Sequence, residues 1–304
     1  YLDKEGGYRD NGIARVMEFA NLISPEQSRF FNWSKPFVQL ETTRGCFNTC
    51  AFCVSGGEKP VRTLSIEVIR ERLKEIHRHG IKNIRVLDRT FNYNNKRAKE
   101  LLNLFLEFSP DICFHLEIHP ALLSEELKQE LAKLPKGLLH LEAGIQSLRE
   151  PVLEQSRRMG RLSDALNGLK YLCALPNMET HADLIAGLPL YHLSEIFEDI
   201  RTLAEYGAGE IQLESLKLLP GTEMRRRAEE LGIQYAPLPP YEVLQTREIS
   251  VDELQTARYL SRLLDGFYNT PAWQSITRKL ILENQTFLHE LLNHLIEIGL
   301  IDQP

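Results

Sequence analysis

The stretch FVQLETTRGCFNTCAFC, residues 37–53, decides the fold and the chemistry expected of this chain. Residues 37–43 are apolar and β-branched enough to form a strand, which a turn should end. Three cysteines follow, with three residues between Cys46 and Cys50 and two between Cys50 and Cys53. Three thiolates this close together can hold three irons of a [4Fe–4S] cluster and leave the fourth iron open to a ligand.

The alternatives for these thiols are a structural zinc site completed by a distant histidine, or no shared ligand. Zinc fingers usually carry paired CxxC units, and the five cysteines of the chain include no second pair. The other two, Cys113 and Cys173, stand in apolar surroundings and are expected to be buried thiols that behave as small hydrophobes. Three cysteines in one loop favour metal binding in a reducing compartment over disulfides.

Composition limits the class of protein. The 304 residues, 43% of them hydrophobic, suffice for one large α/β domain or for one domain with an appendage. The net charge of −6 argues against a nucleic-acid-binding surface. The sequence has no apolar run near the ~18 residues that span a bilayer and no visible signal peptide, which predicts a cytoplasmic protein without a membrane partner. Because the chain begins with Tyr1 rather than Met, we expect it to be a fragment.

Strand and helix patterns alternate six times between residues 37 and 231. Strands are expected at 37–43, 83–88, 112–118, 138–143, 179–186 and 210–216, and helices near 66–76, 96–108, 125–134, 163–172, 193–206 and 223–231. Alternating βα units imply parallel strands with helices outside. The pattern predicts an α/β fold, a partial (β/α)6 TIM-type barrel with its site at the carboxyl ends of the strands. A doubly wound sheet is the alternative.

The periodicity also divides the chain into three expected parts. Residues 1–36 form a lead-in, residues 37–235 form the core barrel, and residues 236–304 form a small helical C-terminal domain. That last part should begin with a proline-rich and extended stretch and continue with helices at 251–268 and 273–300. It carries five Lys or Arg and nine Asp or Glu, so it is acidic.

Polar side chains stand at or near the ends of several predicted strands, where a barrel carries its site. Asp88 could orient a ligand or cap the next helix. Glu117 could hydrogen-bond a ribose diol, and Gln146 offers both a donor and an acceptor. Asp183 lies in an apolar strand, where a carboxylate is costly unless it is paired or used. These four residues are therefore candidates for ligand binding.

Two pairs of charged or titratable residues are harder to assign. Arg157 and Arg158 follow the fourth predicted strand, where a guanidinium could clamp a carboxylate or simply face solvent at a helix start. His115 and His119 lie on the same strand face as Glu117. Histidines at strand ends are more often structural or solvated, so neither is assigned a role.

The segment ETTRGCFNTCAFC, residues 41–53, resembles the cluster loop of the radical S-adenosylmethionine (SAM) enzymes, which has CxxxCxxC at a strand end and an aromatic residue before the third cysteine. Glu117 in HLEIHP, Gln146 in GIQS and Asp183 in DLIAGLP resemble the SAM-binding set of the branch that includes oxygen-independent coproporphyrinogen oxidase. This resemblance implies that Glu117 and Asp183 contact the ribose region of SAM and that Gln146 contacts its polar groups.

The resemblance is incomplete at two places. It implies that an arginine also contacts the polar groups of SAM; we assign this role to Arg158, with Arg157 as a rival, because EQSRRMGRL departs from the family's Ile-Asn-Arg pattern. The family's Gly-Gly-Glu segment on the second strand, which binds the SAM amine, is replaced by residues 86–88, Val-Leu-Asp. Backbone groups and Asp88 would have to substitute for it.

Over roughly residues 37–300 the chain also resembles a narrower family, radical SAM proteins with an N-terminal cobalamin-binding domain and a C-terminal domain of unknown function. The segments THADLIAGLP, QLESLKLLPGTEM, PPYEVLQTREIS and FYN (267–269) carry this resemblance. Only 45 residues precede Cys46, so no cobalamin-binding domain is visible. Cobalamin, and methyl transfer with it, is therefore expected only of a full-length parent protein.

The resemblance implies an enzyme with a [4Fe–4S] cluster on Cys46, Cys50 and Cys53 and with SAM on the fourth iron. Reduction would cleave SAM to methionine and a 5′-deoxyadenosyl radical, which abstracts hydrogen from a small-molecule or peptide substrate. A reducing partner such as flavodoxin or ferredoxin would supply the electron. The segment 239–244 is expected to cover the barrel mouth, because the radical must be kept from water.

Three other functions compete with this one. The first is an RNA-modifying radical SAM enzyme; the acidic C-terminal part argues against it, because RNA affinity draws on Lys and Arg contacts to phosphate. The others are a non-enzymatic protein with a structural metal and an electron-transfer protein. The Glu, Gln and Asp residues at the strand ends make little sense for either of these two.

Overall fold

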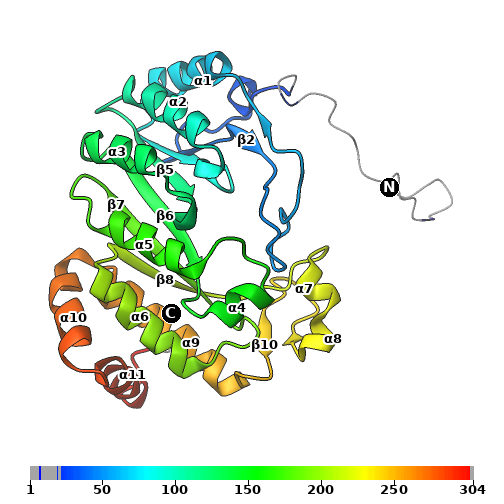
Figure 1. The fold of residues 1–304 in the computed structure, drawn as a ribbon, viewed down its shortest axis with the longest axis vertical. Coiled ribbons are helices and arrows are strands. Elements are labelled where there is room, and N and C mark those ends of the chain that lie inside the picture. The colour runs from blue at the N-terminus through cyan, green and yellow to red at the C-terminus, as the bar shows by residue number, and fades with distance from the viewer. Residues whose placement is uncertain (1–6, 8–18, 20–21, 302–304) are drawn as a thin grey trace.

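The centre of the computed structural model, which describes residues 7, 19 and 22–301, is a six-stranded parallel sheet (Figure 1). Its strands follow the order of the chain: β1 (Val38–Leu40), β4 (Asn83–Val86), β5 (Cys113–Ile118), β6 (Leu139–Gln146), β7 (Glu179–Ala186) and β8 (Glu210–Ser215). Each neighbouring pair is parallel. A doubly wound sheet would reverse its strand order partway, so the structure confirms the partial barrel.

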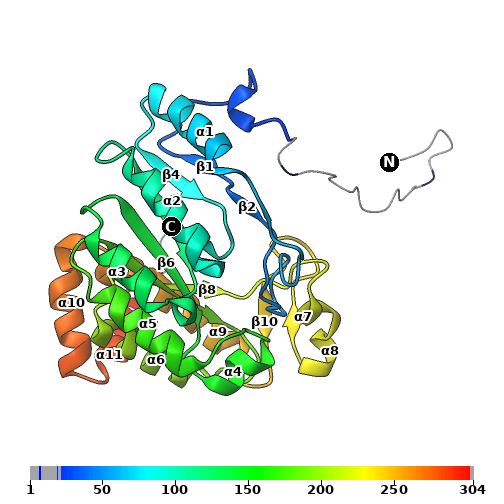
Figure 2. The same ribbon diagram turned by 45° about the horizontal axis from the view of Figure 1, so that its top comes forward.

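Helices connect these strands and follow one another around the outside of the curved sheet (Figures 1 and 2). They are α1 (Ile66–Arg78), α2 (Asn95–Leu106), α3 (Glu125–Lys133), α4 (Glu150–Gln155), α5 (Leu162–Cys173) and α6 (Leu193–Tyr206), with short 3-10 turns η2 (Pro25–Gln27), η3 (Phe91–Tyr93) and η4 (Pro120–Leu122). Helix α1 begins where the Ser65 side chain accepts a hydrogen bond from the Val68 amide, as expected of an N-cap.

The two faces of the sheet differ in polarity. Every second residue of β5, β6 and β7 is buried; Leu116, Leu141 and Leu184 are at most 1% exposed and belong to the core shared with the helices. Most of the alternate positions carry polar or titratable groups, such as Glu117 on β5 and Asp183 on β7. Side chains alternate across a strand, so the inner face of the barrel is polar and free to carry a site.

A short antiparallel pair of strands joins the two ends of the loop that contains the cysteines. Strand β2 (Thr43–Arg44) pairs with β3 (Arg62–Thr63), which brings the two ends of residues 45–61 together. The loop lies beside α7 (Glu223–Arg226) in Figures 1 and 2, and the Met224 amide donates to the Ala51 carbonyl at 2.8 Å. The strand expected over 37–43 therefore ends at Leu40, because the backbone after it turns away to start this loop.

The C-terminal part packs onto the barrel. Strand β9 (Gln234–Tyr235), which follows α8 (Ala228–Leu231), pairs with β10 (Val243–Gln245) across the expected boundary at 235/236. The chain continues through α9 (Val251–Leu263), the π-helical turn η5 (Leu264–Tyr268), α10 (Pro271–Glu283) and α11 (Phe287–Glu297). The Asn269 side chain accepts from the Ile211 amide at 2.9 Å and donates to the Ile211 carbonyl at 3.0 Å. It thus satisfies backbone groups of β8, an edge strand of the sheet.

Two helix predictions were wrong, because the segment near 223–231 forms two short helices, α7 and α8, and the segment 273–300 is also divided. The segment 273–300 is not a single helix, because α10 ends at Glu283 and α11 begins at Phe287. The Asn284 side chain accepts hydrogen bonds from the Thr286 amide at 2.9 Å and the Thr286 hydroxyl at 2.8 Å. Asparagine and threonine favour such local bonds over a continuous helix, which explains the break.

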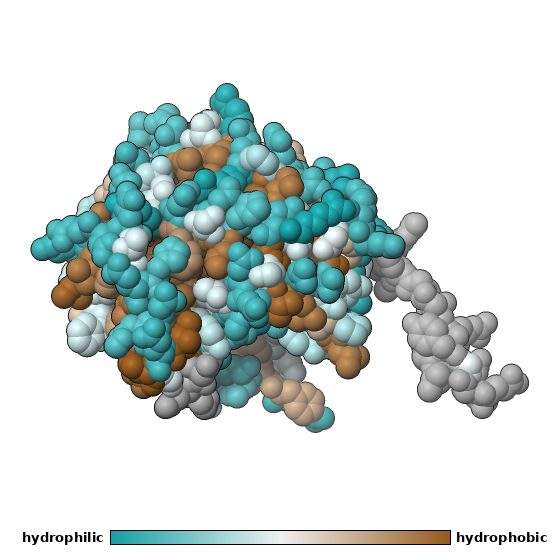
Figure 3. Space-filling view, turned by 90° about the horizontal axis from the view of Figure 1, so that it is seen from below, coloured by the Kyte–Doolittle hydropathy of each residue, from teal (hydrophilic) through white to brown (hydrophobic). Residues whose placement is uncertain are grey.

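The surface seen from below in Figure 3 mixes hydrophobic and hydrophilic residues. Helices α10 and α11 and the residues after them expose several large apolar side chains: Trp273, Ile276, Leu280, Ile296, Ile298 and Leu300. Among the described residues, no helix is both long and apolar enough to cross a membrane.

Candidate active site

A cavity at the carboxyl ends of the strands brings together most of the predicted site residues. It is lined by all three loop cysteines and by four of the five other candidates: Cys46, Cys50, Cys53, Glu117, Gln146, Arg158 and Asp183. These residues come from the cysteine loop, from β5, β6 and β7, and from the segment after α4. Residues 137 positions apart in the chain, from Cys46 to Asp183, thus share one wall.

The cysteine loop is held in place mainly by backbone hydrogen bonds. The Cys46 amide donates to the Glu58 carbonyl at 3.0 Å, and the Ala51 amide donates to the Ser156 carbonyl at 2.8 Å. Gly45 has a φ of +101°, and a side-chain carbon there would lie 2.5 Å from the Glu58 carbonyl oxygen. Only glycine fits that backbone without strain, so Gly45 allows the loop to fold over its first cysteine.

Asp88 anchors the start of this loop and does not line the cavity. Its carboxylate is 1% exposed and accepts hydrogen bonds from the Thr42 and Thr43 amides, both at 2.8 Å, and from the Thr42 hydroxyl. Burial raises the pKa of Asp88, while the bonds from Thr42 and Thr43 oppose that shift. Both carboxylate oxygens are engaged, so the expected contact of Asp88 with a bound ligand has no geometric support.

The two neighbouring arginines have different surroundings. The Arg158 guanidinium donates to the Gly144 carbonyl and lies 3.7 Å from the Cys50 sulfur. The Arg157 side chain is 54% exposed and pairs with Glu223 of α7 at 2.5 Å. Burial raises the pKa of the Cys50 thiol, whereas the positive charge of Arg158 lowers it. Arg158 is therefore the arginine of the cavity, and Arg157 ties the segment to α7.

A bulge in β6 aims Gln146 into the cavity. The pairing of β6 with β7 shifts between Gly144 and Gln146, and Gln146 has a φ of +71°. A side-chain carbon on Gly144 would lie 2.5 Å from the Gln146 amide nitrogen and 3.6 Å from Arg158. Bulges and left-handed non-glycine residues often mark functional sites, and here both turn the same side chain toward the cysteines.

Three carboxyl groups line this cavity together with the thiols. Glu117 and Asp183 were predicted, and Glu142 was not. Glu142 lies on the strand between theirs and is in register with Glu117 on β5 and with His181 on β7. His181 stands two residues before Asp183. Burial and the charges of Asp183 and Glu117 raise the pKa of Glu142 to about 7. Burial also raises the pKa of Glu117, against the pull of Arg89, 3.7 Å away. The alternation in Glu142-Ala-Gly144-Ile-Gln146 could have revealed Glu142, because these three positions share one strand face.

His119, to which the sequence analysis assigned no role, also lines this cavity. Its Nε2 lies 3.0 Å from the Met159 carbonyl, and its amide donates to the Asn92 side chain at 2.8 Å. Burial and the charge of Arg158 lower its pKa to about 3, so the ring is neutral. Among the described residues, the buried Nδ1 of His119 and Oδ1 of Asp183 have no hydrogen-bond partner. Unpaired buried polar atoms are costly, so the His119 Nδ1 is available to a ligand; the Asp183 Oδ1 also lies 2.9 Å from the His181 Nε2.

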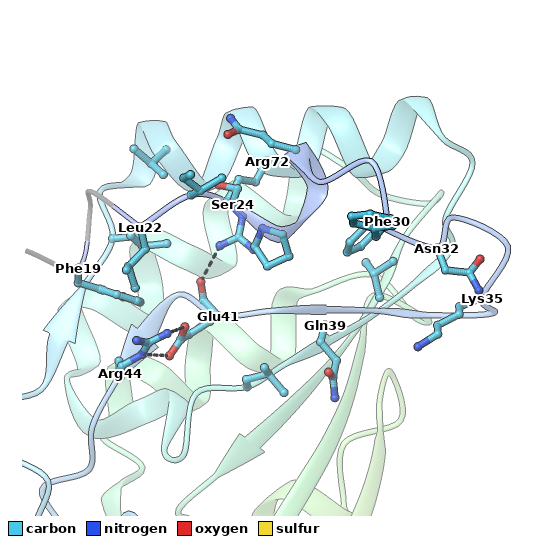
Figure 4. A pocket seen from close by; sticks show the side chains of 18 of the residues that line it. Phe19, Leu22, Ser24, Phe30, Asn32, Lys35, Gln39, Glu41, Arg44 and Arg72 are labelled. Carbon is cyan, nitrogen blue, oxygen red and sulfur yellow. Dashed lines mark hydrogen bonds and ion pairs between the residues drawn. The ribbon is translucent and has the colours of Figure 1, made fainter. Parts of the chain in front are cut away.

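A larger cavity, of about 630 Å³ against about 140 Å³, lies at the β1 edge of the sheet (Figure 4). Its walls are largely apolar, and three of its charged side chains, Glu41, Arg44 and Arg72, have partners within the chain. Arg44 binds Glu41 at 2.6 Å, and Arg72 binds Glu26 at 2.8 Å and the Glu41 carbonyl at 3.2 Å. None of the residues that line it is a cysteine. The smaller cavity is the better candidate for chemistry.

Comparison with known proteins agrees with this geometry. Residues 40–205 match the family described as the Radical SAM superfamily, and residues 229–295 match a family described as a protein of unknown function (DUF4080). The first match covers more than half of the chain and includes the three cysteines and all five other candidate residues. The chain belongs to the radical SAM superfamily of enzymes.

Curated relatives share about a quarter of their aligned residues with this chain. The ribosomal protein uS12 methylthiotransferase RimO of Clostridium tetani is 25% identical over 199 residues, which are 62% of this chain and 44% of that protein. The tRNA-2-methylthio-N(6)-dimethylallyladenosine synthase of Chloroflexus aurantiacus is 23% identical over 252 residues, which are 77% of this chain and 53% of that protein. The chain spans about half the length of these relatives.

A solved structure shows the same fold over nearly the whole chain. The cobalamin-dependent S-adenosylmethionine radical enzyme OxsB, with aqua-cobalamin and S-adenosylmethionine bound, superposes with a TM-score of 0.63 at 15% identity. The match covers 97% of this chain and 52% of that one. The C-terminal helices are therefore part of an arrangement found in another protein.

Proposed function

We propose that this radical SAM protein holds a [4Fe–4S] cluster on Cys46, Cys50 and Cys53 and binds SAM in the same cavity. The observation that carries the proposal is the shared wall: three thiols, Arg158 and three carboxyl groups line one cavity at the carboxyl ends of the strands. In barrels of this kind, that end carries the active site.

The thiols fit a cluster better than a structural zinc ion. Three cysteines from one loop line the cavity, and no other cysteine does. The remaining two, Cys113 and Cys173, are half-buried on β5 and α5, where burial raises the pKa of each thiol. A set of three thiolates beside open space suits a cluster with one iron available, whereas a structural zinc site is closed by four protein ligands.

The polar groups of the cavity fit SAM. The molecule has a carboxylate, a positively charged amine and sulfonium, and a ribose diol. Arg158 offers a donor for the carboxylate, next to Cys50. Glu117 and Asp183 offer acceptors for the diol, and the Asp183 Oδ1 has no hydrogen-bond partner among the described residues. Gln146, aimed by the bulge, offers a further donor and acceptor.

Asp88 acts in this proposal as a positioning residue. Its three hydrogen bonds fix Thr42 and Thr43 immediately before the cysteine loop. The role of binding the SAM amine, which the departure from the family pattern left to backbone groups and Asp88, falls in this proposal to backbone groups and to Glu142, which lines the cavity.

The cofactors supply the difficult chemistry. When bound, a reduced cluster and SAM give methionine and a 5′-deoxyadenosyl radical, which abstracts hydrogen from a substrate. The protein residues orient SAM, and segment 239–244 remains a candidate cover: the Leu218 amide donates to the Tyr241 carbonyl, and the Val243 amide donates to the Leu216 carbonyl, just beyond the carboxyl end of β8. A flavodoxin- or ferredoxin-type partner would deliver the electron.

The substrate is proposed to be a small molecule or a peptide, with macromolecules as the second candidate. One relative is named for a ribosomal protein and the other for a tRNA modification. The expectation against nucleic acid, which rested on net charge, therefore has no support from the relatives. The fold shared with OxsB favours cobalamin in the full-length protein, a proposal about the parent rather than about these residues.

SAM cleavage tests the proposal. The anaerobically reconstituted chain, given dithionite and SAM, should form 5′-deoxyadenosine, measured by liquid chromatography and mass spectrometry. Arg158→Gln should form less at limiting SAM, and Arg157→Gln should match the wild type. A chain that carries a full complement of iron and sulfide but forms no 5′-deoxyadenosine would overturn the proposal in favour of electron transfer.

A further inference from the structure

A second group of titratable side chains lies on the inner face of the sheet, closer to the amino ends of the strands than the cysteine cavity. His140 of β6, His181 of β7 and Glu210 of β8 each offer one ligand atom, and these atoms all lie within 4.8 Å of one another. None of the three lines the cysteine cavity. His140 and His181 stand two residues before Glu142 and Asp183, which places the trio about 6.6 Å further down the strands.

The pairing of the strands brings the trio together. His181 is in register with Glu210, and the His181 Nδ1 lies 3.8 Å from the Glu210 carboxylate. The rings of His140 and His181 meet edge to face, with 6.1 Å between their centroids. Their positions are set by three adjacent strands rather than by a loop, and sites built on such elements hold their geometry well.

A carboxylate sits behind one of the histidines. The His181 Nε2 lies 2.9 Å from the Asp183 Oδ1, although the angle falls outside that of a hydrogen bond. In metal sites the ligating histidine usually gives its other ring N–H to a carboxylate, which fixes the tautomer and the ring orientation. A small ring rotation would complete this arrangement and leave the Nδ1 facing Glu210.

The charges around the trio favour a cation. Glu142 and Asp183 lie above it, and Glu179 lies at its lower edge, 3.5 Å from the His140 Nδ1. A bound cation would offset the negative charge of these carboxylates.

We propose that His140, His181 and Glu210 form a binding site for one divalent transition-metal ion of the zinc, cobalt or iron(II) type, separate from the iron–sulfur cluster. Two imidazoles and one carboxylate are a common ligand set for such ions. Ligands about 2.1 Å from an ion lie about 3.4 Å apart in tetrahedral geometry, so the ligand atoms, now within 4.8 Å of one another, must approach by up to about 1.4 Å. The Glu210 side chain is 42% exposed, so further positions stay open to water. The three ligands lie outside the proposed SAM site, and Asp183, next to His181, also lines the cysteine cavity.

Cobalt binding tests the site in the cluster-loaded chain. With the cluster left oxidised and silent in electron paramagnetic resonance (EPR), added Co²⁺ alone should give a high-spin signal, saturating at one ion per chain, with nitrogen couplings from imidazole. His140→Gln and Glu210→Gln should each weaken binding at least ~10-fold. The exposed His77, which pairs with Asp111, supplies the control: His77→Gln should bind as the wild type does.

Either of two results would overturn the proposal: a wild-type chain that takes up no Co²⁺, or His140→Gln and Glu210→Gln variants that bind Co²⁺ unchanged. Circular dichroism checks that each variant is folded. Glu210→Gln keeps the test valid if His140→Gln fails to fold, because Glu210 is the most exposed of the three ligands. No SAM is present, so the outcome does not depend on SAM binding.

Discussion

The cysteine cavity and the larger cavity at the β1 edge differ in how their polar groups are satisfied. The larger one, at the β1 edge, pairs Arg72 with Glu26 and with the Glu41 carbonyl. The smaller one, at the carboxyl ends of the strands, holds three thiols and buried atoms of His119 and Asp183 without hydrogen-bond partners among the described residues. Paired charges stabilise a fold, whereas unpaired buried polar atoms are a cost that a ligand can remove. Volume alone would have pointed to the larger cavity.

Removal of the thiols should have the largest effect. Cys46→Ala, Cys50→Ala and Cys53→Ala should each abolish the cluster signal and SAM cleavage, because each would leave one iron without its thiolate. Cys173→Ala, which removes a thiol outside the cavity, is the matched control. Iron and sulfide analysis together with EPR measures the outcome. A cluster that survives in all three loop variants would place the iron elsewhere.

Substitution of Arg158 should have the second-largest effect on SAM cleavage. Arg158→Gln removes a charged donor beside Cys50 and should raise the SAM concentration for half-maximal cleavage about 10- to 100-fold, as expected for a charge-assisted hydrogen bond. Arg157→Gln removes only an exposed pair with Glu223 and should change it less than about threefold. Equal effects of the two substitutions would contradict the assignment of Arg158 to the cavity.

The raised pKa of Glu142 should make the stability of the chain depend on pH. Its folded-state pKa is raised from 4.5 to about 7, so the folded chain holds this proton more tightly than the unfolded chain. The free energy of unfolding of the ligand-free chain should therefore fall as pH rises from about 4.5 to 7. Glu142→Gln should remove about 1–2 kcal/mol of that fall, after allowance for solvent screening. Urea unfolding of the wild type and of Glu142→Gln at pH 5 and pH 8 measures this difference. The same change in the free energy of unfolding between the two pH values in both proteins would contradict the prediction.

A substitution beside the larger cavity should have the smallest effect on the chemistry. Glu26→Ala breaks a buried pair and should cost about 3 kcal/mol of stability. It should leave the EPR signal and SAM cleavage unchanged at temperatures where the variant is folded. Thermal unfolding and the cleavage assay separate the two effects. Loss of SAM cleavage in the folded variant would show that the larger cavity takes part in the chemistry.

The parts of the fold and site predicted from sequence were those with local signals. The alternation of strand and helix placed the six βα units, and the spacing of the cysteines placed the cluster loop. The chain order of the strands, which distinguished the barrel from a doubly wound sheet, is a long-range property and needed the structure. So did the break at Asn284, which depends on one side chain bonding to Thr286 instead of continuing the helix.

The site shows the same division. Glu117, Gln146 and Asp183 were predicted because polar side chains stand at or near the ends of predicted strands, and all three line the cavity. Asp88 has the same sequence signal, yet it bonds to Thr42 and Thr43, because the loop turns back over it. His119 was left without a role because a lone histidine carries no pattern that separates a cavity wall from a solvated surface.

The central claim is that cluster and SAM share one cavity. EPR of the anaerobically reconstituted, dithionite-reduced chain, recorded with and without SAM, tests it most directly. The account predicts a [4Fe–4S]⁺ signal that changes when SAM is added and that does so only at higher SAM concentration in Arg158→Gln. A cluster signal indifferent to SAM, or a chain that binds zinc and no acid-labile sulfide, would contradict it.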